Sequence, residues 1–134
     1  MDIRRYLQPG DLVVVAQLGA EPTSLTDALF AASRDIPGLR VLTSFPLGAP
    51  EARMAATGVK FLAMDGFGAN GALFLEGRLD IAPARFSDYW RLFDGKLKPD
   101  VVLCSVTPPD ADGNVSLGVT VDHLPHAIAR ARVA

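Results

Sequence analysis

Residues 100–118, DVVLCSVTPPDADGNVSLG, contain the pattern that decides the fold. They open with an apolar, β-rich run at 101–106, and a strand that is apolar on both faces is typical of a parallel sheet covered by helices on both sides. Pro108 and Pro109 end this strand, because proline cannot donate a hydrogen bond to a neighbouring strand. After an Asp-Gly turn, a short strand is predicted at 115–117. The loop therefore leaves the carboxyl end of a buried strand, where open α/β sheets bind their ligands.

Length and composition indicate one ordinary folded domain. The chain has 134 residues, of which 49% are hydrophobic and 21% charged, so it can bury a core and does not resemble a disordered protein. The net charge of −2 provides no basic surface for nucleic acid or for a membrane. No apolar run approaches a membrane span, and the N-terminal residues lack the apolar core of a signal peptide. We therefore expect a cytoplasmic protein with no nucleic-acid or membrane partner.

The remaining pattern alternates apolar runs with helical segments. Further strands are predicted at 12–17, 39–44, 59–64 and 79–82. Thr23 or Ser24 should cap the first helix, with Asp27 in capping-box spacing. Further helices are expected at 51–57, before Glu76, at 88–93 with Ser87 as the cap, and after a cap at Asp122. The alternation predicts an α/β fold, a mostly parallel open sheet with flanking helices.

Cysteine and histidine suggest no catalytic or metal centre. Cys104 is the only cysteine, so no internal disulfide can form, and its place in a buried strand favours a small core residue over a nucleophile. His123 and His126 lie three residues apart with only Asp122 beside them. A solvated helix face is therefore favoured over a zinc site, and we predict no metal.

Two features leave alternatives open. Gly66-x-Gly68-x-x-Gly71 lies between a strand and a helix, as a dinucleotide fingerprint requires. The following helix is short and the unit is third in the chain, which favours a glycine-rich turn instead. Glu21 follows the first strand and should lie over the carboxyl edge of the sheet, where it could line a substrate pocket or cap the adjacent helix.

The order of these segments resembles the N-terminal domain of the acetyl-CoA hydrolase/transferase family, which includes 4-hydroxybutyrate CoA-transferases. The likeness extends over nearly the whole chain. Its most specific part is SVTPPDADGNVSLG at 105–118, close to the family pattern S-P-P-D-x-x-G-x-x-S-L-G, with Thr107 in place of the usual serine. Glu21-Pro22 and the segment DIAP at 80–83 support it.

This resemblance implies a two-domain enzyme in which a glutamate of the C-terminal half attacks an acyl-CoA thioester. The acyl group then passes to a carboxylate or to water in a ping-pong cycle. Coenzyme A would be a substrate, and no cofactor is implied. Carried onto this sequence, the pocket of the N-terminal half would be lined by Gly19, Glu21, Pro22, Ser44, Phe45, Pro46, Phe67, Gly68, Ser87, Pro108, Pro109, Asp110 and Gly113.

The sequence departs from the family where the chemistry should occur. The half that carries the nucleophilic glutamate is absent from residues 1–134, and the chain ends after a helix where another strand is expected. We therefore predict the front module of an acyl-CoA hydrolase or CoA-transferase, inactive alone and completed by a C-terminal half or a partner subunit. The alternative is a non-catalytic α/β domain that binds a small carboxylate or CoA, or an interaction subunit. An uncovered sheet edge and apolar surface also predict self-association into a homo-oligomer.

Overall fold

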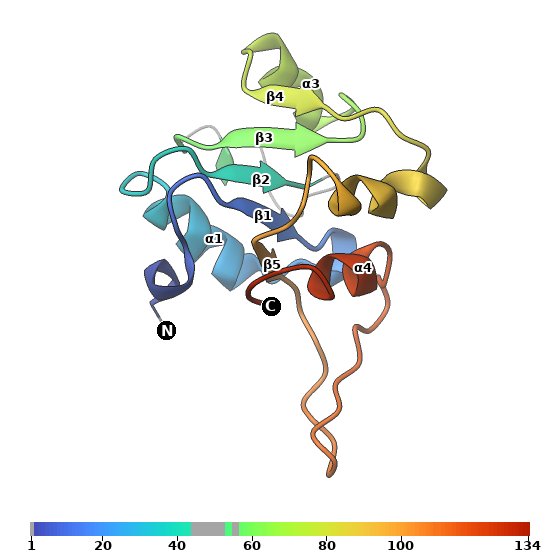
Figure 1. Ribbon diagram of the computed structural model, residues 1–134. Coiled ribbons are helices and arrows are strands. Elements are labelled where there is room, and N and C mark those ends of the chain that lie inside the picture. The colour runs from blue at the N-terminus through green and yellow to red at the C-terminus, as the bar shows by residue number, and fades with distance from the viewer. Residues whose placement is uncertain (1, 44–52, 55–56) are drawn as a thin grey trace.

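The computed structural model describes residues 2–43, 53–54 and 57–134. Their centre is an all-parallel sheet of five strands in the order β4-β3-β2-β1-β5 (Figure 1). The strands are β1 (Leu12–Val15), β2 (Arg40–Leu42), β3 (Lys60–Ala63), β4 (Leu79–Ile81) and β5 (Val101–Leu103). Flanking helices complete the predicted α/β architecture.

Alternating strand side chains divide the core into two layers. Val13 and Val15 of β1 face a layer that contains Leu29 of α1 (Thr23–Ala32), Ile3 of η1 (Ile3–Tyr6) and Leu73 of α3 (Ala69–Leu75). Leu12 and Val14 face the opposite layer, which contains Tyr89 and Phe93 of η3 (Phe86–Asp94) and Leu124 of α4 (Leu124–Ile128). All four β1 side chains are buried, because β1 has a strand on each side and a layer on each face.

The strands are shorter than predicted, and the helix starts differ. α1 begins after Pro22 and has no side-chain cap, so the predicted capping box is wrong. Ser87 lies inside η3, a 3-10 helix preceded by Arg85, and therefore does not cap it. α4 follows His123 rather than Asp122, which has the unusual φ of +49°. In the segment predicted at 51–57, the described residues Arg53 and Met54 are helical.

The last residues of the chain pair with the outer edge of β5. Val133 forms a parallel bridge with Val101. Its N–H donates to Asp100 O (3.1 Å), and its carbonyl accepts from Val102 N–H (2.9 Å). Arg132 supports this pairing through a 2.8 Å ion pair with the buried carboxylate of Asp11. The sequence predicts a chain that ends directly after the last helix, with no strand to follow. Instead α4 ends at Ile128, and Val133 pairs with β5.

Residues 105–121 form an arm that projects from the body as two extended legs (Figure 1, orange). The legs are joined by Thr107 N–H to Ser116 O (3.0 Å) and by Ser116 N–H to Thr107 Oγ1 (2.9 Å). At the tip, the carboxylate of Asp110 accepts from the N–H groups of Asp112 and Asn114, which lowers the pKa of Asp110. The predicted strand at 115–117 is wrong, because these residues join no ladder of the sheet.

No helix in the described ranges is long and apolar enough to cross a membrane.

Candidate functional site

Loops from the central strands meet at the carboxyl edge of the sheet. Since every strand is parallel to its neighbours, the segments that follow β1, β3 and β5 leave from one edge. β1 leads into η2 (Leu18–Ala20) and then Glu21, while β5 leads into Ser105. Ser105 N–H donates to Ala20 O (2.8 Å) and ties the base of the arm to the Glu21 loop.

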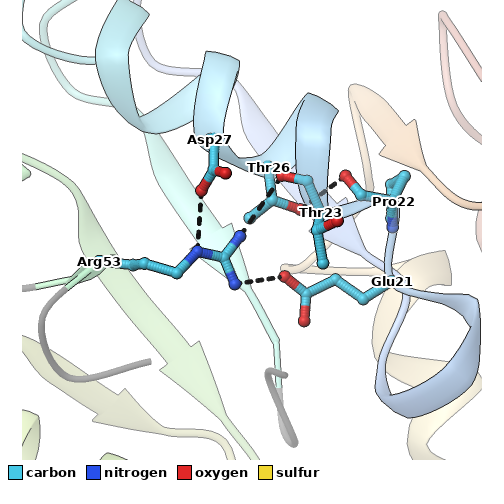
Figure 2. A network of polar contacts seen from close by, with 6 residues as sticks. All are labelled: Glu21, Pro22, Thr23, Thr26, Asp27 and Arg53. Atoms are coloured by element: carbon cyan, nitrogen blue, oxygen red, sulfur yellow. Dashed lines mark hydrogen bonds and ion pairs between the residues drawn. The ribbon is translucent and has the colours of Figure 1, made fainter. Parts of the chain in front are cut away.

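Glu21 is buried at this edge and paired with Arg53. Its side chain is 1% exposed, and its Oε1 lies 3.0 Å from Arg53 Nη1 (Figure 2). A buried carboxylate is stable in its charged form when a hydrogen-bonded cation compensates the lost hydration. Arg53 provides that cation.

Arg53 also connects Glu21 to the first turns of α1. Its Nε donates to Asp27 Oδ1 (2.8 Å), and its Nη2 lies 3.5 Å from Thr23 O. Its guanidinium carbon is 5.9 Å from the centroid of the Phe30 ring. Partial burial acts to lower the pKa of Arg53, but the bonds to Asp27 and Glu21 outweigh it and raise the pKa. Arg53 therefore links Glu21, in the loop after β1, to Thr23 and Asp27 of α1. These contacts hold the Glu21 carboxylate in one position.

The space beside this network is small. Glu21, Arg53 and Thr43 line it together with apolar side chains from β1, β2 and α1, and its volume is about 10 Å³. That volume holds about one water molecule.

Gly19, Pro22 and Phe67 lie on two of the loops at the carboxyl edge. Gly19 is packed so closely that an added Cβ would lie 3.0 Å from Val119 Cγ2 of the arm. Pro22 is the residue from which α1 starts. Phe67 is 80% exposed. Substrate contacts of these residues stay a prediction.

Gly68 and Gly71 show why the glycine-rich segment turns. Gly68 has a φ of +56°, which favours glycine, and a Cβ at Gly71 would lie 2.9 Å from Gly66 O. Gly68 precedes α3 and Gly71 lies in its first turn, and this helix has 7 residues. A tight strand-to-helix turn accounts for these glycines.

The other predicted pocket residues lie apart from the Glu21 network. Ser87 is exposed on η3, and Pro108, Pro109, Asp110 and Gly113 lie on the arm near its tip (Figure 1). Ser44, Phe45 and Pro46 lie outside the described residues. The structure therefore places Gly19, Glu21 and Pro22 together on one loop and does not bring the tip residues to it.

A second polar cluster is buried beneath the β1 loop. The amide of Gln17 donates to a carboxylate oxygen of Asp122, and His123 Nδ1 lies 3.2 Å from the other oxygen of Asp122. Gln17 Oε1, Tyr89 Oη and both ring nitrogens of His123 are buried without a well-aligned hydrogen-bond partner. His123 packs against Tyr89 and Phe93, with centroids 5.6 and 5.4 Å apart.

The predicted solvated histidine face is therefore wrong for His123. Burial lowers the pKa of His123 and outweighs the opposing effect of the Asp122 carboxylate. His126 is exposed, and its ring stacks on Trp90 with centroids 4.9 Å apart. Within the described ranges, no group of three His, Cys, Asp or Glu side chains could hold a metal ion.

Sequence reasoning missed Arg53 and the Gln17–Asp122 contact. Arg53 lies 32 positions from Glu21, and Gln17 lies 105 positions from Asp122. Neither pair belongs to a motif. The available signal was that Gln17 and Glu21 are polar residues directly after a fully apolar strand, and such residues need partners when buried.

Comparison with solved structures shows the fold. RipA from Yersinia pestis matches with a TM-score of 0.83 at 24% identity, over 99% of this chain and 38% of RipA. A 4-hydroxybutyrate CoA-transferase from Porphyromonas gingivalis matches with a TM-score of 0.69 at 22% identity, over 98% of this chain and 30% of that protein. The chain thus spans less than two fifths of the length of either structure. No protein-family model and no curated protein matches the sequence.

Proposed function

We propose that this chain is the substrate-lining half of a short-chain acyl-CoA transferase or hydrolase, completed by a second protein unit that supplies the nucleophilic glutamate. The observation that supports it best is the fold match over 98% of the chain to a 4-hydroxybutyrate CoA-transferase. The motif at 105–118 adds a feature that the fold alone does not require.

The contacts of two glutamates of this chain support the proposal of a second unit. The chain has three glutamates, Glu21, Glu51 and Glu76. Glu21 is buried against Arg53, and Glu76 lies 3.5 Å from Arg78 on the surface of the α3–β4 turn. Glu51 lies outside the described residues. A nucleophile must be accessible and aimed at the thioester carbonyl. Glu21 is not accessible, and Glu76 lies on a surface turn away from the carboxyl edge of the sheet.

In the proposed cycle, a glutamate carboxylate of the second unit attacks the thioester and releases CoA as the thiolate. CoA then attacks the enzyme-bound anhydride, which leaves a glutamyl-CoA thioester and frees the first carboxylate. An incoming carboxylate reverses these steps, whereas water would complete a hydrolysis. Acetyl-CoA with a second carboxylate is the expected substrate pair. The single cysteine accords with a reducing, cytoplasmic compartment.

The test is thioester exchange between acetyl-CoA and acetate, succinate or 4-hydroxybutyrate. We expect no exchange by the chain alone and exchange when it is mixed with its cognate second unit. Formation of free CoA without exchange would identify a hydrolase. Absence of either activity with every cognate unit would contradict the proposal.

A non-catalytic carboxylate- or CoA-binding domain is the second candidate. The observation that favours it is that Glu21, the glutamate at the carboxyl edge, is buried against Arg53 and is not placed to act as a nucleophile. Calorimetry of the chain with acetate, succinate and CoA separates the two functions. Tight binding without any activity on mixing would favour the second.

A further inference from the structure

Two contacts hold the base of the arm to the loop at 17–22, which follows β1. At the start of the first leg, Ser105 N–H donates to Ala20 O (2.8 Å). At the end of the second leg, the carboxylate of Asp122 accepts from the side-chain amide of Gln17. Both legs of the arm are therefore attached to one loop at the carboxyl edge of the sheet.

The backbone on both sides of the Gln17–Asp122 contact is strained. In the described ranges, Leu18 and Asp122 are the two residues other than glycine with a positive φ, at +51° and +49°. Asp adopts this conformation more readily than Leu, and a bulky residue keeps it only where the surrounding contacts impose it. Leu18 directly follows Gln17, so loss of the contact would allow both strained residues to relax.

The ring of His123 lies beside this contact in apolar surroundings. Its Nδ1 is 3.2 Å from the Asp122 oxygen that Gln17 does not bind. Both ring nitrogens are buried without a well-aligned hydrogen-bond partner, and the ring packs against Tyr89 and Phe93. The ring therefore fits this place best in its neutral form.

The groups packed around His123 compensate a positive charge poorly. From η3, Tyr89 contacts the ring. Burial, and after it the charges of Asp122 and of Asp65 in the segment after β3, raise the pKa of Tyr89, so its hydroxyl stays neutral. From the loop after β1, Gln17 provides an uncharged amide. Asp122 is thus the carboxylate that would face a protonated His123, and Gln17 already shares it.

Protonation of His123 would place a charge and a new N–H donor in this layer. In the described contacts Nε2 has no acceptor, and a buried donor without an acceptor is costly, the more so when it is charged. Burial accordingly lowers the pKa of His123 more than Asp122 raises it. The protonated ring is more stable in water, and because Asp122 is its neighbour in the chain, a ring that leaves the layer draws Asp122 away from Gln17.

We propose that Gln17, Asp122 and His123 form a pH-sensitive latch, in which neutral His123 holds the second leg of the arm on the loop at 17–22 and protonated His123 releases it. The first leg stays attached through Ser105, so the arm becomes mobile while the sheet stays folded. This inference does not depend on the proposed function.

The first test follows the native chain by NMR from pH 7.5 to pH 4. The ring signals of the two histidines report their protonation, with His123 assigned by its loss in His123→Gln, and the backbone order parameters of residues 119–121 report the mobility of the second leg. We expect order parameters of about 0.85 at pH 7.5 and below about 0.6 at low pH, with the midpoint of the His123 titration. Residues 12–15 of β1 should stay rigid.

Three results of this experiment would overturn the proposal. They are a second leg that is already mobile at pH 7.5, a second leg that stays rigid after His123 is protonated, and a His123 ring that remains neutral down to pH 4. A rigid leg with protonated His123 would mean that the ion pair with Asp122 holds the latch closed.

The second test breaks the latch at pH 7.5 without changing the charge. Gln17→Leu removes the amide that binds Asp122, and Gln8→Leu is the matched control, because Gln8 is exposed. We expect the order parameters of residues 119–121 to fall below about 0.6 in Gln17→Leu and to stay near 0.85 in Gln8→Leu. His126→Gln should retain the pH response of the native chain, and His123→Gln should lose it. Equal order parameters in the two glutamine variants, or a pH response that survives His123→Gln, would contradict the latch.

Discussion

The Glu21–Arg53 pair determines how the β1–α1 loop is held. Replacing Arg53 with Met removes the cation but leaves the Glu21 carboxylate buried, since the Arg53 side chain is 20% exposed and that of Glu21 1%. Loss of one partner from a buried pair is costly. We expect Arg53→Met to lower the free energy of unfolding by about 3 kcal/mol in urea denaturation, the lower end of the range for a buried pair, because Arg53 is partly exposed.

Arg4→Met is the matched control for this substitution. Arg4 lies 3.6 Å from Asp35, and both side chains are more than half exposed, at 58% and 66%. Its loss should change the free energy of unfolding by less than about 0.5 kcal/mol. Equal effects of the two substitutions would show that the Glu21 network does not stabilise the loop.

His123 should make stability depend on pH. Because burial holds the pKa of folded His123 below its unfolded value, the unfolded chain binds a proton first as the pH falls. The free energy of unfolding should be constant above pH ~6.5 and decrease below it, by at most about 1.4 kcal/mol per pH unit, until folded His123 is also protonated. His123→Gln should flatten this slope, whereas His126→Gln, at an exposed site, should retain it. Indistinguishable slopes for native protein and His123→Gln would refute the assignment.

The contacts of individual polar side chains were harder to predict from the sequence than the burial of apolar runs. The apolar character of 101–103 was visible and these residues are buried, because periodicity reports burial directly. The partner of Glu21 was not visible, since the β1–β2 pairing and the position of Arg53 bring the two together only in the fold. The burial of His123 depends in the same way on η3, which supplies Tyr89 and Phe93.

At the level of elements, the first turn of α3 requires glycine at position 71, because it packs against the segment that follows β3. Alanine in place of glycine within a helix normally stabilises by about 1 kcal/mol. At Gly71 the added Cβ would lie 2.9 Å from the backbone oxygen of Gly66, and relieving such a clash typically costs about 1–3 kcal/mol. Gly71→Ala should therefore lower the melting temperature.

Gly58→Ala provides the comparison for this turn. A Cβ at Gly58 would meet no heavy atom within 4 Å, and Gly58 has no positive φ. Its substitution should leave the melting temperature unchanged or slightly raised. A stabilising Gly71→Ala would mean that the turn can open at little cost.

Element positions followed from the sequence better than element ends. All five strands lie within their predicted runs, whereas the predicted caps at Thr23 or Ser24, Ser87 and Asp122 are wrong. A cap depends on the local backbone path, which Pro22 and the positive φ of Asp122 alter. The strand predicted at 115–117 is wrong, because these residues lie on the arm and join no strand of the described chain.

For the whole molecule, the parallel α/β class was predictable, and the strand order was not. Short strands joined by helices favour parallel pairing, because a parallel pair needs a crossover connection and this is usually a helix. The order β4-β3-β2-β1-β5 places β5 beside β1. The paired residues Val13 and Val101 are 88 positions apart in the chain (101 − 13), so no local pattern encodes their contact. The sequence pattern also did not show that the arm, residues 105–121, projects from the body of the protein (Figure 1).

The central claim is that this chain lines the substrate site while another unit provides the nucleophile. It is tested most directly by trapping the mixture of the two units during turnover of acetyl-CoA and locating the covalently bound CoA by peptide mass spectrometry. The account predicts a glutamyl-CoA thioester on a glutamate of the second unit and none on Glu21, Glu51 or Glu76 of this chain. CoA bound to any of these three residues, or formed on the chain alone, would contradict it.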